Sequence, residues 1–218
     1  MDQKVQDAIA HFSKTPWCAA LISRPGATHF VPHEPRAGSV AVDLTQDQLF
    51  RKTLRTPSTV PHQLGFFQDP FGPHPETSKP ASSSGLTMLN PVVTVLYDLQ
   101  PGVNGFNGTT HGGFISCIID EAMGSIIYTN YDELMGAKMK HKLPDNVPDL
   151  SDARVFTASI SVQLKKPILT PNIVAVVAEL DRIETRKLLF KITVKNNDVV
   201  FAEAQGLWIV VPNAKPKI

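Results

Sequence analysis

The sequence predicts an α+β protein in which one long helix covers an antiparallel β-sheet. One strand-like run precedes a long apolar stretch from His111 to about Asn130, and four further runs follow that stretch without another helix. Consecutive strands joined by short turns pair antiparallel, and a single helix then covers their apolar face. This order differs from the alternation of strands and helices in a doubly wound nucleotide-binding fold.

Each strand is predicted from its residue pattern. The expected strands are Val92–Leu99, Phe156–Lys165, Ile173–Leu180, Lys187–Lys195 and Val199–Val211. In the second of these, apolar residues from Phe156 to Leu164 alternate with polar residues from Thr157 to Lys165, which is the period of a half-buried strand. Strict alternation places Thr157 on the polar face. Asn196, Asn197 and Asp198 predict a hairpin turn between the last two strands.

The first 87 residues are expected to form an extension that packs on, or precedes, a folded domain over residues 88–218. Two short helices are expected in the extension, Asp2–Lys14 and Thr45–Leu54, from their apolar spacing. Residues 56–91 are rich in Pro, Ser and Gly and predict irregular chain. In the domain, residues 131–152 predict a polar connection interrupted by proline.

Composition excludes several classes of protein. The 218 residues carry 21 basic and 20 acidic side chains, which argues against a nucleic-acid partner recognised through bulk charge. Cys18 and Cys117 cannot build a disulfide framework. We expect no membrane span and no signal peptide, and therefore a cytoplasmic protein, with mitochondria and peroxisomes left open.

The predicted helix has two different sides. A broad apolar face is formed by Ile115, Ile118, Ile119, Ala122, Met123, Ile126 and Ile127. The opposite side carries small residues and one carboxylate: Gly113, Cys117, Asp120 and Gly124. Small residues let a ligand or another backbone approach closely. A helix–helix contact with a solvated Asp120 is the alternative interpretation.

The start of the helix predicts a site that can stabilise negative charge. Thr109 or Thr110 can cap the helix, and His111, Gly112 and Gly113 occupy its first turn. The first amides of a helix lack intrahelical acceptors and lie at the positive end of its dipole. Glycines leave those amides accessible, so a carbonyl oxygen that gains charge during attack could bind there.

His111 and Asp120 are too far apart to act on one carbonyl within a single chain. Nine residues of helix span about 13 Å. If two copies pair with antiparallel helices, the first turn of one meets Asp120 of the other, and a two-fold axis creates two equivalent sites. We therefore expect a homodimer, possibly a dimer of dimers.

Three segments resemble hot-dog-fold acyl-CoA thioesterases, including the phenylacetate-pathway type and the thioesterase-superfamily members of animals. GTTHGGFISCIIDEAMG resembles the central-helix signature, in which an acid follows the His of HGG by nine residues. TASISVQLKKPI is similar to the next strand, and AELDRIETRKLLFKITV to the following hairpin. The likeness covers about residues 88–212 and implies an antiparallel sheet wrapped around one central helix.

The resemblance implies specific roles. Asp120 would activate water as general base or attack as nucleophile, and Thr157 would orient the water. The Gly112 amide of the partner chain would polarise the thioester carbonyl, and His111 would support the loop or contact the substrate. The family often has an Asn six residues before the His, where this chain has Gly105.

The remaining candidates are residues expected to bind the substrate. They are Gly113, Asn104, Asn107, Glu121, Arg182, Arg186 and Lys187. Glu121 points about 100° away from Asp120 around the helix and is expected to be solvated. The cationic residues at the hairpin after Leu180 could hold coenzyme A phosphates or simply form a solvated turn.

The expected reaction is hydrolysis of an acyl thioester, carried by coenzyme A or by acyl carrier protein, without a metal or redox cofactor. The chain has no Gly-x-Ser-x-Gly elbow, P-loop or Cys-x-x-Cys pair. His29 and His33 are interpreted as loop histidines. A hot-dog dehydratase or hydratase and a non-catalytic acyl-CoA-binding protein are the alternatives.

Overall fold

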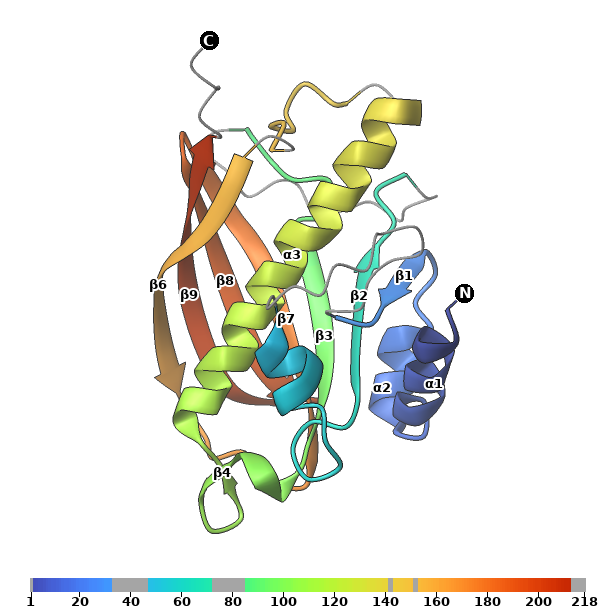
Figure 1. Cartoon of the computed structure of the whole chain (residues 1–218), viewed down its shortest axis with the longest axis vertical. Coiled ribbons are helices and arrows are strands. Elements are labelled where there is room, and N and C mark those ends of the chain that lie inside the picture. Colours follow the sequence, from blue (N-terminus) through green and yellow to red (C-terminus); the bar gives the residue numbers. More distant parts are fainter. Residues whose placement is uncertain (1, 33–46, 72–84, 141–142, 151–152, 213–218) are drawn as a thin grey trace.

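The fold was analysed in a computed structural model of the chain, which describes residues 2–32, 47–71, 85–140, 143–150 and 153–212. A seven-stranded antiparallel sheet curves around one long helix, α3 (Gly112–Lys140), as Figure 1 shows. In sheet order the strands are β1 (Ala27–Phe30), β2 (Gln63–Gln68), β3 (Val92–Leu99), β7 (Asn172–Glu184), β8 (Lys187–Asn196), β9 (Val199–Pro212) and β6 (Ala153–Leu164). The predicted α+β, hot-dog arrangement is confirmed.

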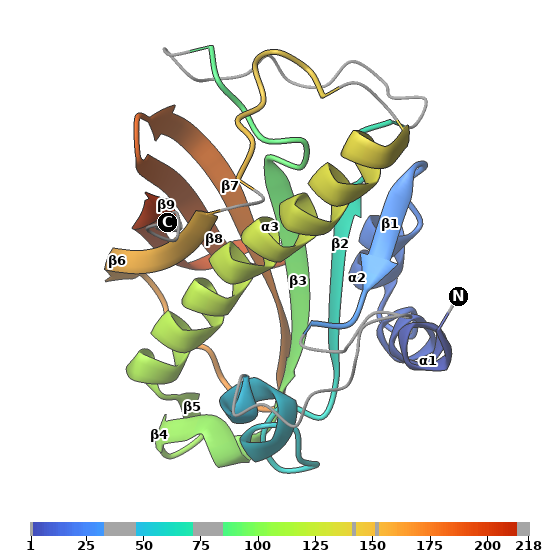
Figure 2. The same cartoon turned by 45° about the horizontal axis from the view of Figure 1, so that its top comes forward.

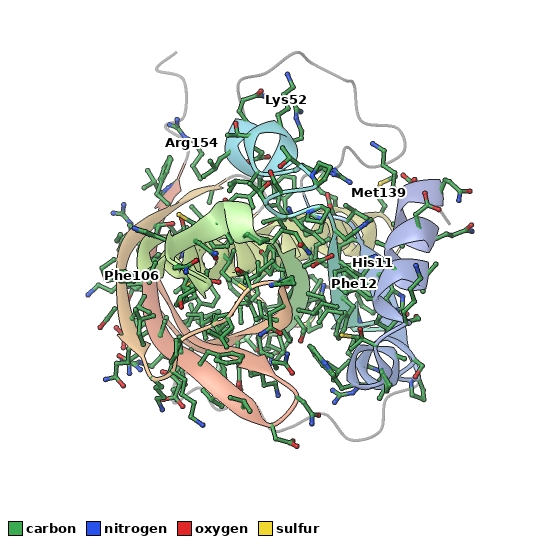
Figure 3. All side chains as sticks on the ribbon, turned by 90° about the horizontal axis from the view of Figure 1, so that it is seen from below. His11, Phe12, Lys52, Phe106, Met139 and Arg154 are labelled. Carbon is green, nitrogen blue, oxygen red and sulfur yellow. The ribbon has the colours of Figure 1, made fainter. Side chains whose placement is uncertain are left out.

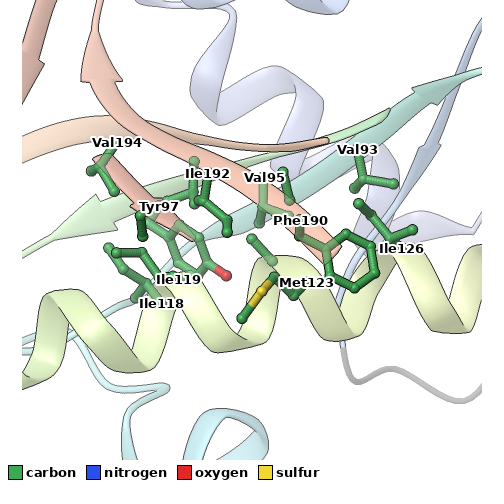
Figure 4. Packing of buried hydrophobic residues seen from close by; sticks show 14 of the residues in the cluster. Val93, Val95, Tyr97, Ile118, Ile119, Met123, Ile126, Phe190, Ile192 and Val194 are labelled. Carbon is green, nitrogen blue, oxygen red and sulfur yellow. The ribbon is translucent and has the colours of Figure 1, made fainter. Parts of the chain in front are cut away.

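Helix α3 packs its apolar face into the concave side of the sheet. Ile118, Ile119 and Met123 are fully buried against residues of β3 and β8 such as Tyr97 and Phe190 (Figure 4). Each large aliphatic side chain buried in this way contributes about 1.5–3 kcal/mol. The sequence therefore identified the face that anchors the helix.

The close approach of α3 to the sheet requires a glycine in β9. A Cβ atom at Gly206 would overlap the sulfur of Met123 and meet Ile192. Gly206 is buried, and Met123 and Ile192 belong to the core cluster around α3. A side chain at residue 206 would force the Met123 side chain out of its present position.

The helix is longer than the sequence predicted. The expected polar connection over residues 131–152 is wrong for its first part, because α3 continues to Lys140. Leu134 is buried, and the Asn130 side chain donates to the carbonyl of Asn90 at 2.7 Å and accepts from its amide at 2.8 Å. These tertiary contacts extend the helix past the point where its amphipathic pattern fades.

The N-terminal extension contributes two strands to the same sheet. β2 pairs with β3, and β1 pairs with β2, so the sheet continues across the boundary expected at residue 87. The prediction of irregular chain over residues 56–91 is wrong for Gln63–Gln68. The second expected helix, Thr45–Leu54, contains a π-helical turn, η1 (Leu49–Thr53). The first two residues of the expected helix lie outside the described part of the chain.

Two helices near the N-terminus cover the other face of the sheet. α1 (Gln3–Phe12) is confirmed, whereas α2 (Pro16–Ile22) was not predicted. Phe12 of α1 packs against Leu64, Leu96 and Ala175 in a second apolar cluster, separate from the one around α3. Figure 2 shows the two helices beside β1 and β2, on the side away from α3.

A histidine pair joins α1 to the sheet. His11 Nε2 lies 3.0 Å from Asp98 Oδ2, and the His11 ring stacks on the ring of His62 with centroids 3.8 Å apart. The side chain of Gln100 donates to the other Asp98 oxygen at 2.7 Å. Figure 3 shows His11 and Phe12 on the side of α1 that faces the sheet.

The charges around His62 make this contact sensitive to pH. Burial lowers the pKa of His62, His11 lowers it further, Asp98 raises it, and Arg55 and Lys14 lower it. The net pKa is below the ordinary 6.5, so the folded protein binds fewer protons than the unfolded chain as the pH falls. Stability from this group is present above pH about 6.5 and is lost below it.

We expect His62→Gln to flatten the loss of stability on acidification, because the replacement has no proton to gain. Urea unfolding at several pH values between about 7 and 5 measures the free energy of unfolding for both proteins. The wild type should lose more than the variant over this interval. Equal losses would contradict the assignment to His62.

Candidate functional site

The candidate site lies along the seam between α3 and β6. Thr157 Oγ1 donates a hydrogen bond to Asp120 Oδ1 at 2.8 Å, although the two residues are 37 positions apart in the chain. The structure thus brings together two of the residues singled out in the sequence. Asp120 is half-buried and Thr157 is exposed.

A β-bulge in β6 gives Thr157 this orientation. Thr157 pairs with Trp208 of β9 and Ser159 pairs with Leu207, so Ala158 is one extra residue in the ladder. Before the bulge, Val155 and Thr157 face the helix; after it, Ile160 and later even-numbered residues do so. The predicted strict alternation from Phe156 to Leu164 is therefore wrong, and Phe156 is 53% exposed.

The environment of Asp120 favours its protonated form more than water does. Burial raises the pKa of Asp120 above its ordinary value, the hydrogen bond from Thr157 lowers it, and the charge of Glu121 raises it. The net shift is upward. A carboxyl with a raised pKa is better suited to accept a proton than an ordinary surface aspartate.

The loop before α3 is held on three sides. η2 (Pro101–Val103) and the short hairpin of β4 (Asn104–Phe106) and β5 (Thr109–Thr110) form this loop. The His111 amide donates to Val103 O at 2.9 Å, and the Thr110 amide donates to Ile168 O at 2.9 Å. The Gly102 amide donates to Ser58 O at 2.6 Å. These contacts fix where the first turn of α3 begins.

His111 caps the helix with its side chain. Its Nδ1 atom accepts a hydrogen bond from the Gly113 amide at 2.9 Å. The expected caps, Thr109 and Thr110, instead belong to β5, so that prediction is wrong. Because His111 engages the Gly113 amide, Gly112 provides the first-turn amide that can serve an external acceptor.

Gly105 explains the departure from the family pattern at this position. A Cβ atom there would come within 2.7 Å of the His111 ring. A larger residue would displace the ring that caps α3. The neighbouring Asn104 accepts a hydrogen bond from Thr170 Oγ1 at 2.7 Å, and Asn107 lies exposed in the β4–β5 turn.

Glu121 is half-buried, which corrects the expectation of a solvated side chain. Its charge raises the pKa values of Tyr97, Cys117 and Asp120, after the larger effect of burial on each. Tyr97 is fully buried in the core beneath α3. Glu121 is therefore close enough to Asp120 and Tyr97 for its charge to act on both.

The cationic hairpin lies at the level of Thr157 in the sheet, two strands away, because Leu188 pairs with Trp208 of β9 and Trp208 pairs with Thr157. Arg182 is paired with Asp181 and Glu184, both at 2.7 Å, and the Arg186 guanidinium donates to Val210 O at 3.1 Å. Lys187 opens β8 at the same turn. The first residue of β7 pairs with Leu99, just before the loop that precedes α3. The hairpin lies at the other end of β7, so the full length of β7 separates the hairpin from this loop.

Sequence reasoning missed Trp208, which shapes the seam. The ring of Trp208, opposite Thr157, lies 3.7 Å from the point where a Cβ of Gly124 would stand. Gly124 was noted only for its small size. The position of Trp208 depends on the pairing of β6 with β9, for which the local sequence carries no signal.

Among the described residues, no three or more His, Cys, Asp or Glu side chains gather as a possible metal site. His29 lies in β1, 3.0 Å from the carbonyl of Ile22, and His33 lies outside the described residues. Over the same ranges, none of the helices is both long enough and apolar enough to traverse a bilayer.

Comparisons with known proteins point to one superfamily. The model of the thioesterase superfamily matches residues 107–202. Verlamelin biosynthesis protein B of Lecanicillium sp is 27% identical over 173 residues, which are 75% of this chain and 72% of that protein. Acyl-coenzyme A thioesterase THEM4 of Bos taurus is 27% identical over 116 residues, 52% of this chain and 39% of the relative. The chain thus matches about two fifths of this second relative.

Solved structures with similar folds include two bacterial proteins. A mutant thioesterase from Pseudomonas aeruginosa aligns with 56% of this chain and 76% of its own, at 13% identity and a TM-score of 0.45. A hypothetical thioesterase from Streptococcus pneumoniae, solved with coenzyme A, aligns with 57% of this chain and 85% of its own, at 12% identity and a TM-score of 0.44.

Replacing Thr157 by Val should raise the pKa of Asp120 further, because the hydrogen bond that lowers it is lost. Thr157→Ser keeps the hydroxyl and should leave the pKa near that of the wild type. Carbon-13 NMR titration of the aspartate carboxyl measures the change. An unchanged or lower pKa in the valine variant would show that the hydrogen bond is not formed in solution.

Proposed function

Because residues 107–202 match the model of the thioesterase superfamily, we propose that the protein hydrolyses an acyl thioester to a free acid and a thiol. Coenzyme A is the proposed carrier. The name of the THEM4 relatives, acyl-coenzyme A thioesterase, supports this choice over acyl carrier protein. Hydrolysis by this route requires a base, a positioned water and a donor for the oxyanion.

The observation that carries the proposal is the hydrogen bond between Thr157 and Asp120. It holds the carboxylate in one orientation at the seam, half-buried and with a raised pKa. One Asp120 oxygen accepts from Thr157, so the other can accept a proton from water. The hydroxyl oxygen of Thr157, which donates its own proton to Asp120, can accept a hydrogen bond from the same water.

The proposed reaction proceeds in two steps. Asp120 takes a proton from water while the water oxygen bonds to the thioester carbon, and the carbonyl oxygen becomes an oxyanion. The Gly112 amide donates to this oxyanion. The tetrahedral intermediate then collapses, the carbon–sulfur bond breaks, and the leaving thiolate takes the proton from Asp120.

Two copies of the chain are proposed to share each site. Gly112 and Asp120 lie eight residues apart on one helix, about 12 Å along its axis, which is too far for both to touch one thioester group. An antiparallel pairing of the two α3 helices would bring Gly112 of one copy to Asp120 of the other. The homodimer thus follows from the chemistry proposed.

The surface near α3 has the features that such a dimer needs. β6 is the last strand of the sheet order, so among the described strands its outer edge has no partner. Exposed sheet edges readily pair with another chain. Three large apolar side chains near the helix start are also exposed: Phe106 at 83%, Leu164 at 56% and Leu169 at 61%. Figure 3 labels Phe106 among them.

Asp120→Asn should lower kcat about 100- to 10,000-fold, the usual contribution of a general base. Thiol release from an acyl-CoA measures the rate. Asp198→Asn, in the exposed β8–β9 turn, is the matched control and should keep wild-type activity. In the wild type, kcat/KM should fall as the pH drops through the raised pKa of Asp120. Full activity of the Asp120 variant would end the proposal.

Gly112→Pro should lower kcat about 100- to 1,000-fold, because it removes the amide that would donate to the oxyanion. Proline is accepted at the first position of a helix, so α3 should still form. Gly112→Ala keeps the amide, and its Cβ meets only the flexible end of Leu164 at 3.2 Å, so it is the matched control. Equal rates for the two variants would remove Gly112 from the mechanism.

Mixing the two inactive variants tests whether the site is shared. In a dimer of one Asp120→Asn chain and one Gly112→Pro chain, one of the two shared sites has both groups intact. Random exchange of subunits should therefore restore about a quarter of wild-type activity. A site built within one chain would regain nothing.

A further inference from the structure

An apolar cavity lies on the same seam as Asp120 and Thr157, beyond the proposed reaction centre. It has a volume of about 60 Å³. Its walls come from both sides of the seam, and the residues that matter here are Met88, Ile127, Tyr131 and Leu134 with Ala153 and Val155 of β6. Tyr131 is 44% exposed, so the lining reaches the protein surface.

The cavity and the reaction centre share two facing surfaces. Asp120 and Ile127 are seven residues apart on α3, nearly two full turns, so they lie on the same side of the helix, and the expected grouping of Ile127 with the opposite, apolar face is wrong. Thr157 and Val155 are two residues apart on β6 before the bulge, so they face the same way. Between Asp120 and Ile127, Gly124 contributes no side chain to the seam, and the Trp208 ring lies 3.7 Å from the point where its Cβ would stand.

The cavity wall suits an apolar ligand because its side-chain amide already has hydrogen-bond partners within the protein. Asn130 is the one carboxamide of the cavity wall. Its oxygen accepts from the Asn90 amide, and its nitrogen donates to the carbonyls of Asn90 and Ile126, at 2.7–2.8 Å. The remaining side chains that reach the cavity are aliphatic, thioether or aromatic.

We propose that this cavity binds the end of a straight, saturated acyl chain and that Leu134 and Ala153 set the chain length. The inference rests on the proposed thioesterase function. Seven residues of helix place Ile127, the lining residue of α3 that is nearest to Asp120 in the sequence, about 10 Å from Asp120. An extended alkyl chain advances about 1.3 Å per carbon, from single bonds of about 1.5 Å. About eight carbons therefore reach Ile127.

The volume limits what can enter. Since one water-sized group occupies about 10–15 Å³ on the same measure, the cavity has room for about four such groups. The acyl chain that fills it has about twelve carbons. A chain of six carbons would end in the seam and would gain nothing from the cavity.

The first experiment compares hexanoyl-CoA with dodecanoyl-CoA by thiol release. The wild type should have at least about a tenfold higher kcat/KM for dodecanoyl-CoA, since one methylene in an apolar pocket can be worth that factor. Leu134→Phe narrows the cavity and should remove this preference while leaving the hexanoyl rate within about twofold. The neighbouring Met135, 45% exposed and outside the lining, gives the matched control Met135→Phe.

Two further variants keep the test decisive. Ala153→Val narrows the cavity from β6 at a half-buried position, in case Leu134→Phe does not fold. Leu134→Ala enlarges the cavity and should shift the preference towards hexadecanoyl-CoA. A wild type without length preference, or narrowing variants that affect both substrates equally, would overturn the assignment while leaving the hydrolysis intact.

A binding measurement separates this inference from the proposed function. Calorimetry follows the hexyl and dodecyl thioethers of coenzyme A, which have no carbonyl to attack, on wild-type protein and on Leu134→Phe. Tighter binding of the dodecyl compound by the wild type alone supports the tail pocket, even if no thiol release is found. Equal binding of both compounds by both proteins would refute it.

Discussion

The position of the candidate site depends on how α3 packs against the sheet. Ile118, Ile119 and Met123 are completely buried, and Gly206 leaves the space that Met123 occupies. A rotation of the helix by one residue, about 100°, would take these side chains out of the core, at about 1.5–3 kcal/mol each. The packed face thus fixes the direction of Asp120, which has no apolar anchor of its own.

The parts of the fold that could be predicted are those whose pattern is local. β3 has the bounds expected from its run of apolar residues, and the hairpin at Asn197 follows from its turn residues. The apolar face of α3 follows from helical spacing alone. For the site, His111, Gly112 and Asp120 could be singled out because they lie at or within one continuous helix, where the spacing in the sequence determines the distance in space.

The parts that could not be predicted depend on pairing between distant segments. The orientation of Thr157 is set by the match of β6 to β9, and the extra residue at Ala158 is invisible in a single strand. β2 was hidden because its neighbours are rich in proline, although its own residues are buried. Glu121 was expected in water because its effect on the buried Tyr97 depends on how α3 packs against β3, a segment that is distant in the sequence.

The extra residue in β6 also separates the strand into two independently oriented halves. If all residues of β6 were kept but alternated without the bulge, Arg154 and Phe156 would turn inward and Val155 and Thr157 would face solvent. Loss of the bulge would thus put a guanidinium into the apolar lining and take the hydroxyl away from the carboxylate, whereas deletion of Ala158 itself would restore a regular ladder to β9 and leave both halves as they face now. The register of β6 with β9, rather than any one side chain, keeps both Val155 and Thr157 facing α3.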